Sequence, residues 1–335
     1  MRSTTAGEET VTPDRAIGSA PTVMQSLSFH LRPLPPFRLD LTAWALRRRA
    51  RNIVDRWDGG TYRRVLVIHK SPVEVAVTQT GSADHPTLAV TVAGARLIPE
   101  TRAIIRRLLT TMLGLRTNLQ PFYQLAVKDR RLLPLVQQFR GLKPPRFPSV
   151  FEALANAISC QQLSLTVGIE LLNRIVVQCG PAFPLDDYQE HAFPRAEDLL
   201  RTKAPTLRRL GFSYRKARFL LSLSRQIVAG DFMPEQLQHR DNGSAVEGLM
   251  DLNGVGRWTA EYVLLRGMGR IDTFPGDDVG ARNRLAVWLG RDGPLDYDGV
   301  KRAVHRWYPY AGLVYFHLLL AGLTDSGEMN QGAAA

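Results

Sequence analysis

A glycine-rich turn near residue 255 has the composition of a phosphate-binding helix start. It reads Leu252-Asn253-Gly254-Val255-Gly256-Arg257-Trp258-Thr259-Ala260 and separates two segments with helical periodicity. Glycines on both sides of a small apolar residue let backbone N–H groups approach a phosphate with no Cβ in the way. Such groups grip a nucleic-acid backbone whatever the bases, so Gly254, Val255, Gly256 and Arg257 are candidate DNA-binding residues. The alternative is a plain turn between helices, and the length of the match favours the functional interpretation.

A pair of carboxylates follows one helix later, in Phe274-Pro275-Gly276-Asp277-Asp278. A helix is predicted to begin at Val279, and the positive end of its dipole favours ionised Asp278. Aspartate is also common at that position simply as a helix cap. The catalytic alternative is that Asp278 stabilises positive charge developing on a sugar, or orients water towards it. Asp277 is the second candidate.

Trp258 and Tyr262 stand four residues apart on the helix that follows the turn, so they share one face. Aromatic rings beside a phosphate grip can stack on a base swung out of the duplex. A pair of core aromatics is the structural alternative.

Two polar segments farther upstream are further candidates. Gln161-Gln162 interrupts an apolar helical run, and its side chains can push into the gap left by an extruded nucleotide. A helix-terminal polar pair is the alternative. The basic run Arg47-Arg48-Arg49-Ala50-Arg51 is interpreted as a solvated helix face, with contact to DNA as the second reading.

The composition suits a soluble partner of a polyanion. The 335 residues are 44% hydrophobic and 22% charged, and 43 Lys and Arg against 31 Asp and Glu give a net charge of +12. Lysine and arginine near phosphates release condensed counterions, although the excess can also serve solubility alone.

With only Cys160 and Cys179, a disulfide scaffold or a cysteine-based metal cluster is not expected. No apolar run approaches the roughly 20 residues of a membrane span, and residues 1–28 lack a signal-peptide pattern, so we expect a cytoplasmic protein.

The sequence divides into an α+β part and an all-α part. Residues 1–28 and 324–335 have little periodicity and are predicted to be disordered. Residues 29–118 are predicted to form a small antiparallel-sheet α+β domain, with alternating segments at 37–41, 61–68, 73–77 and 88–92 and helices at 43–57 and 99–113. Residues 119–323 are predicted to be all-α, in two helical subdomains with a cleft between them. The helical periodicity there covers 120–127, 130–140, 150–179, 196–201, 213–229, 245–250, 258–268, 279–289, 300–307 and 312–322.

Several ordered motifs together make the chain resemble the helix-hairpin-helix (HhH-GPD) DNA glycosylase superfamily, near the 3-methyladenine DNA glycosylase II branch. The resemblance covers about residues 147–323, and residues 30–118 resemble the N-terminal domain of that branch through weaker cues. The motifs are Phe151-Glu152-Ala153 with Gln161-Gln162-Leu163-Ser164, Gly211-Phe212-Ser213-Tyr214-Arg215-Lys216-Ala217, the hairpin, Pro275-Gly276-Asp277-Asp278 and Trp307-Tyr308-Pro309-Tyr310-Ala311.

The resemblance implies roles for individual residues. Asp278 matches the catalytic aspartate, Trp258 and Tyr262 match base-pocket aromatics, and Gln162 falls at the wedge position. No cofactor is required, but the hairpin would hold a structural monovalent cation (Na⁺ or K⁺) with the backbone carbonyls of Met250, Leu252 and Val255. Trp258 occupies the position of the Schiff-base lysine of bifunctional relatives, so no lyase step is expected. The four-cysteine iron–sulfur loop is missing, and a further pocket tryptophan is replaced by Leu319.

The resulting hypothesis is a monofunctional DNA glycosylase of base excision repair that flips out and hydrolytically releases alkylated bases of the 3-methyladenine and 7-methylguanine type. Its partner would be double-stranded DNA with a damaged base, it would not bind membranes, and a monomer is the simplest arrangement. Two alternatives remain open: a monofunctional glycosylase for uracil or deaminated bases, and a non-catalytic helix-hairpin-helix DNA-binding protein.

Overall fold

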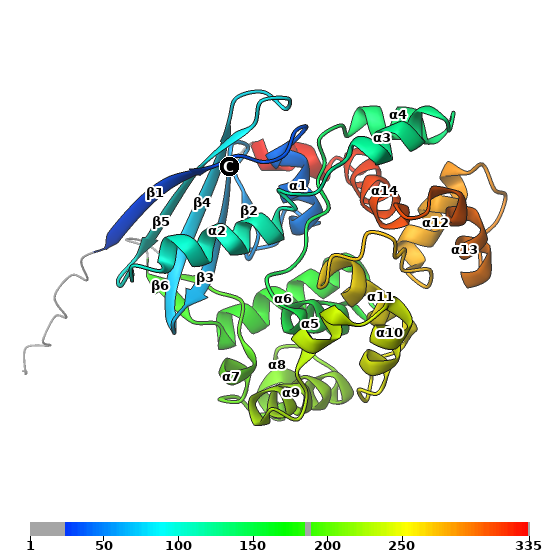
Figure 1. Cartoon of the computed structure of the whole chain (residues 1–335). Coiled ribbons are helices and arrows are strands. Elements are labelled where there is room, and N and C mark those ends of the chain that lie inside the picture. Colours follow the sequence, from blue (N-terminus) through cyan, green and yellow to red (C-terminus); the bar gives the residue numbers. More distant parts are fainter. Residues whose placement is uncertain (1–23, 185–188, 334–335) are drawn as a thin grey trace, which may run out of the picture.

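The computed structural model describes residues 24–184 and 189–333, which form a sheet region joined to a larger helical region (Figure 1). The five-stranded antiparallel sheet has the order β1-β5-β4-β3-β2. Its strands are β1 (Gln25–Leu31), β2 (Arg56–Trp57), β3 (Thr61–Ile68), β4 (Ser71–Thr80) and β5 (Thr87–Gly94). The strict alternation of β4 and β5 buries Val73, Val75, Val77, Val90 and Val92 on one face. Helices α1 (Leu39–Arg47) and α2 (Thr101–Met112) pack on that face and complete its core.

The helical region folds around two cores. One core joins residues of α5 (Val150–Cys160), α6 (Leu165–Cys179), α9 (Tyr214–Ala229), α10 (Asn242–Met250) and α11 (Arg257–Arg266). The other core joins residues of α3 (Gln120–Val127), α4 (Leu132–Gln138), α12 (Val279–Trp288), α13 (Tyr297–Val304) and α14 (Ala311–Asp325). Short helices α7 (Ala196–Leu199) and α8 (Ala204–Arg209) and the 3₁₀ turns Pro234–His239, His305–Trp307 and Glu328–Ala333 fill the connections.

Helix α1 connects the sheet region to the second helical core. Its residues Leu39, Ala43 and Leu46 pack in the sheet core, whereas Trp44 and Ala45 pack with α14. The second helical core therefore combines segments that precede the first core in the sequence with segments that follow it. Among the described residues, no helix is both long and apolar enough to span a membrane.

The α+β fold class and most predicted elements are confirmed. β3 has the predicted bounds, and α2, α3 and α9 lie where the periodicity predicts helices. Side-chain caps explain several helix starts: the hydroxyls of Ser149, Ser164 and Ser213 accept backbone N–H groups of the first turns of α5, α6 and α9.

Two predictions about residues 37–57 are wrong. The alternating segment 37–41 is not a strand, because α1 begins at Leu39 and buries residues on several sides, which hides its helical period. The helix predicted over 43–57 ends at Arg47, and Arg56–Trp57 form β2.

Other elements are also corrected. The helix predicted over 150–179 is two helices, because Gln162 has a positive φ of 56° and Ser164 caps a new start. The part after residue 119 is not free of strands, since β6 (Ala182–Pro184) pairs with β7 (Gln189–His191). Residues 25–28 are not disordered but belong to β1, and residues 324–333 are mostly helical. The rest of the predicted N-terminal disorder, residues 1–23, lies outside the described residues.

Candidate active site

A cavity of about 1040 Å³ lies between the two helical cores and gathers residues from distant segments. Its walls include the end of α5, the hairpin between α10 and α11, the start of α12 and one face of α14. The predicted site residues that line it are Gln161, Gln162, Gly254, Val255, Gly256, Trp258, Tyr262, Asp277, Asp278 and Leu319.

Asp278 caps α12 with one carboxylate oxygen and keeps the other at the cavity wall. Its Oδ1 accepts the backbone N–H of Ala281 at 2.9 Å and so caps α12. Its Oδ2 accepts longer hydrogen bonds from the Trp258 indole (3.3 Å) and the Tyr315 hydroxyl (3.2 Å). The cap fixes the carboxylate, while its second oxygen lies among aromatic groups at the cavity wall.

The aromatic pair forms a continuous wall next to this carboxylate. The rings of Trp258 and Tyr262 are 5.5 Å apart between centroids, and Trp258 is only partly buried. Tyr262 is 4% exposed, and burial raises the pKa of its hydroxyl, so it stays neutral. Leu319 lines the same cavity, so an aliphatic side chain faces a space that a tryptophan would narrow.

The hairpin has the backbone features that a phosphate grip requires. Gly254 has φ +91°, and a Cβ there would lie 3.2 Å from the Phe219 ring. Gly256 caps α11 with no side chain, and no heavy atom lies within 4 Å of the place of its Cβ. Among the described residues, the N–H groups of Arg257, Trp258 and Thr259 have no acceptor. These open donors at a helix N-terminus favour an anion.

The two glutamines have different surroundings. Gln161 donates from Nε2 to the Gly254 carbonyl (3.1 Å) and to Thr259 Oγ1 (2.9 Å), which joins α5 to the hairpin. Gln162 is exposed at the cavity rim, and its backbone turns away from the helix with φ 56°. Gln162 is therefore the one that can reach out of the protein, while Gln161 holds two walls together.

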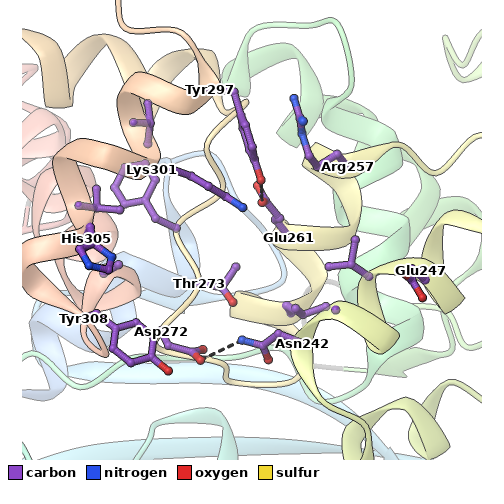
Figure 2. A pocket seen from close by; sticks show the side chains of 17 residues that line it. Asn242, Glu247, Arg257, Glu261, Asp272, Thr273, Tyr297, Lys301, His305 and Tyr308 are labelled. Atoms are coloured by element: carbon purple, nitrogen blue, oxygen red, sulfur yellow. Dashed lines mark hydrogen bonds between the residues drawn. The ribbon is translucent and has the colours of Figure 1, made fainter.

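Arg257 lies on the other side of α11 from the aromatic pair. Its guanidinium contacts Asp277 at 2.8 Å and covers the Tyr297 ring at 3.4 Å from the centroid. It lines a second cavity, of about 460 Å³, with Glu261, Tyr297 and Lys301 (Figure 2). The predicted contact of its side chain with DNA would have to replace the Asp277 partner.

The second cavity supports the turn that carries Asp278. Figure 2 shows Glu261 of α11 and Tyr297 of α13 reaching toward each other. The Tyr297 hydroxyl donates to Glu261 Oε1 at 2.6 Å, and the Gly276 N–H donates to Glu261 Oε2 at 3.0 Å. Glu261 thus fixes the backbone two residues before Asp278.

Two residues of the large cavity were missed in the sequence. Tyr315 precedes Leu319 by one helical turn, and that spacing on α14 was the available signal. Its pKa lies well above the usual value, because of burial first and then the charge of Asp278, so it remains a hydrogen-bond donor. Arg48 was interpreted as part of a solvated face, yet it is 3% exposed and lines the cavity. No local pattern marks that placement.

Comparison with known proteins gives a family match across this region. Residues 155–310 match the model of the HhH-GPD superfamily base excision DNA repair proteins. A DNA-3-methyladenine glycosylase of Bacillus subtilis is 26% identical over 204 residues, which are 61% of this chain and 67% of that protein. DNA-3-methyladenine glycosylase 2 of Escherichia coli is 28% identical over 179 residues, 53% of this chain and 60% of that protein.

The fold comparison reaches farther along the chain. The solved structure of a 3-methyladenine DNA glycosylase from Archaeoglobus fulgidus is similar with a TM-score of 0.78 and 26% identity. The similarity covers 89% of this chain and 99% of that one, so it includes the sheet region that the family model leaves out.

Proposed function

Because residues 155–310 match the model of the HhH-GPD superfamily of base excision DNA repair proteins, we propose that the protein is a monofunctional DNA glycosylase. It binds double-stranded DNA, flips a damaged base into the large cavity and hydrolyses its N-glycosidic bond. Alkylated purines of the 3-methyladenine and 7-methylguanine type are its substrates. The observation that carries this proposal is the contact of Asp278 with Trp258 in a cavity bounded by the hairpin.

The residues divide the work by their chemistry. The open N–H groups after Gly256 bind a backbone phosphate, and Gln162 fills the gap that the flipped nucleotide leaves. The base stacks on Trp258 and Tyr262, which leaves its sugar beside Asp278. An alkylated purine already carries positive charge and leaves readily. Asp278 then stabilises the cationic character of the sugar while water adds to C1′.

No lyase step accompanies base release. Trp258 occupies the position at which bifunctional members carry an amine, and an indole cannot form a Schiff base. Cys160 also lines the cavity, but burial raises the pKa of its thiol, so it is a poor nucleophile. The product is therefore an abasic site in an intact strand.

The hairpin suits a structural monovalent cation. Of the carbonyl oxygens of Met250, Leu252 and Val255, only that of Leu252 accepts a backbone hydrogen bond within the described chain, from Val255 at 3.0 Å. Two oxygens without such a bond fit a hard cation such as Na⁺ or K⁺, which takes oxygen ligands. The ion would add positive charge beside the bound phosphate.

Two further proposals concern the state of the enzyme. It acts as a monomer, since one chain supplies the cavity, the hairpin and the catalytic carboxylate. It works in the cytoplasm.

The test is a base-release assay on methylated duplex DNA that measures free 3-methyladenine and 7-methylguanine. We expect both bases to be released, and the abasic strand to stay intact until alkali is added. A nick without alkali would contradict the monofunctional mechanism. Release of uracil or deaminated bases alone would favour the other glycosylase specificity, and binding without any release would leave only a DNA-binding protein.

A further inference from the structure

A buried arginine from the end of α1 lines the large cavity together with Asp278. Arg48 is the residue that ends α1, and it is 3% exposed. Its Nη1 donates to the Tyr262 hydroxyl at 2.8 Å, and its Nη2 donates to Asn156 Oδ1 at 2.6 Å. Since Tyr262 stacks near Trp258, and Trp258 contacts Asp278, the wall runs in the order Asp278, Trp258, Tyr262, Arg48.

The charge of Arg48 has no carboxylate partner within the described residues. It forms no salt bridge there, and its buried Nε has no hydrogen-bond partner. Arg266, 1% exposed, lies with its guanidinium carbon 5.7 Å from the Tyr262 ring and also forms no salt bridge in the described chain. By contrast, the equally buried Arg64 contacts Asp55 at 2.8 Å and Glu152 at 2.6 Å. Buried charges without a direct carboxylate contact are costly, and Arg48 and Arg266 place two such charges beside Tyr262.

The backbone of Arg48 is also strained. Its φ is +62°, in the left-handed region where glycine ends many helices and other residues are uncommon. Its N–H still donates to the Trp44 carbonyl at 2.8 Å, so the turn is held in place. Strained backbones of this kind cluster at functional sites, and here the strained residue lines the cavity with its guanidinium bound to the hydroxyl of Tyr262.

The two ends of the cavity match the charge movement of glycosidic hydrolysis. The C1′–N bond breaks and its electron pair moves to the base nitrogen. A water oxygen bonds to C1′ and the water gives up a proton. A neutral base takes up one proton as it leaves, whereas a cationic base leaves neutral and the proton of the water passes to solvent. Negative Asp278 at the sugar end and positive Arg48 at the base end both favour this displacement.

The size of the Arg48 contribution depends on the charge of the base. A neutral base leaves with developing negative charge, which a guanidinium stabilises directly. A cationic base becomes neutral as it leaves, and its bound state is repelled by the same guanidinium. Arg48 therefore has its largest effect on neutral bases.

We propose that Arg48 is a specificity-determining residue, which stabilises negative charge on an uncharged base as it departs and so extends the substrate class to neutral damaged bases. This inference rests on the proposed glycosylase function.

The test compares duplexes that differ only in the lesion, either neutral hypoxanthine or cationic 7-methylguanine. Wild type is compared with Arg48→Met, Arg48→Lys and the exposed control Arg51→Met in single-turnover excision. We expect Arg48→Met to slow hypoxanthine release by about 100-fold and 7-methylguanine release by less than about fivefold, as loss of one preorganised charge predicts. Arg48→Lys should restore part of the hypoxanthine rate. Arg51→Met, whose side chain is 79% exposed, should change neither rate.

The outcomes separate this inference from the function on which it rests. Equal slowing of both lesions by Arg48→Met would mean that Arg48 only orients Tyr262, and would overturn the inference. Release of 7-methylguanine but not hypoxanthine by wild type would overturn it and leave the glycosylase function intact. Release of neither base would remove the function itself. If Arg48→Met does not fold, as judged by circular dichroism, Arg48→Gln takes its place, because it also removes the charge. A fall of more than about tenfold in the hypoxanthine to 7-methylguanine rate ratio supports the charge role, and an unchanged ratio contradicts it.

Discussion

Helix α11 places a pair of side chains at a spacing of four residues in each of two cavities, and one pair is aromatic while the other is charged. Trp258 and Tyr262 face the large cavity, while Arg257 and Glu261 face the smaller one, each pair four residues apart. Beside the smaller cavity, Arg257 pairs with Asp277, a residue of the large cavity, and Glu261 accepts from Tyr297 and Gly276. In the large cavity Asp278 has only longer contacts on one oxygen, and Arg48 has an unpartnered nitrogen.

The contrast indicates which side reacts and which side supports. Groups that already satisfy each other hold the backbone in place, whereas groups left incompletely paired are available to a ligand. We therefore assign catalysis to the large cavity and the positioning of the Asp278 turn to the smaller one. The following variants test that division.

The largest effect is expected for Asp278→Asn. Asparagine caps a helix as well as aspartate does, so α12 should keep its start while the negative charge is lost. We expect base release to fall by about 100- to 1000-fold, with binding to a duplex containing an abasic analogue nearly unchanged. Single-turnover excision and fluorescence anisotropy measure the two.

The matched control is Asp277→Asn, which removes the same charge from the neighbouring residue that pairs with Arg257. It should keep its rate within about tenfold of wild type, because it loses only a partly exposed ion pair, 47% and 29% exposed on its two sides. Unchanged base excision in Asp278→Asn would remove this carboxylate from the mechanism.

Trp258→Ala should have the next largest effect. Loss of stacking on a flipped base costs about 1 to 3 kcal/mol, or roughly 5- to 150-fold in rate. The control is Trp288→Ala, whose ring packs on Trp307 at 5.4 Å outside the large cavity. That variant should lose stability but keep the excision rate of the folded fraction. A wild-type rate in Trp258→Ala would make Trp258 a core residue instead.

Gly276→Ala tests the supporting side. A Cβ at this position would lie 2.7 Å from the Tyr297 ring, so the backbone before Asp278 must shift. We expect a loss of about 1 to 3 kcal/mol in stability, as overpacking commonly costs, and about a tenfold slower excision. Gly293→Ala is the control, because no atom lies within 4 Å of its Cβ position. A rate loss larger than that of Trp258→Ala would reject the division between the two sides.

The smallest effect concerns pH and Glu261. Burial raises the pKa of this carboxyl above its ordinary value of 4.5, so the folded protein keeps its proton to higher pH than the unfolded chain does. Its contribution to stability is thus greatest below pH 4.5 and declines as the pH rises through the raised pKa. Urea unfolding of wild type and Glu261→Gln at several values between about pH 4 and about pH 8 measures the difference between their free energies of unfolding. If the free energy of unfolding of wild type, relative to that of Glu261→Gln, increased with pH, the raised pKa would be contradicted.

Local patterns were enough to predict most of the residues that the structure brings together in the large cavity. Three features depend only on residues within one or two helical turns, so they can be predicted from the sequence. They are the glycines of the hairpin, the cap at Asp278 and the spacing of Trp258 and Tyr262. The elements that failed are those whose surroundings decide them. Segment 37–41 alternates like a strand, but α1 is buried on several sides, so its pattern does not show the helical period.

Arg48 and Glu261 show the limit of local patterns from the opposite direction. Arg48 sits in a run of arginines that looks solvated, yet its partners Asn156 and Tyr262 are 108 and 214 residues away. Glu261 looks like an ordinary polar position on α11, yet it holds the Gly276 backbone across 15 residues. No periodicity or motif in the sequence predicts either of these contacts.

By itself, then, the sequence determined the hairpin, the capped carboxylate and the aromatic pair, because short-range backbone geometry and helical spacing fix them. Only the tertiary structure decided that these groups share one cavity and that Gln161 joins two walls while Gln162 stays free. It also decided that Arg48, at the end of α1, lines the same cavity. The physical reason is that burial and charge pairing depend on segments distant in the chain, which meet only when both helical cores have formed.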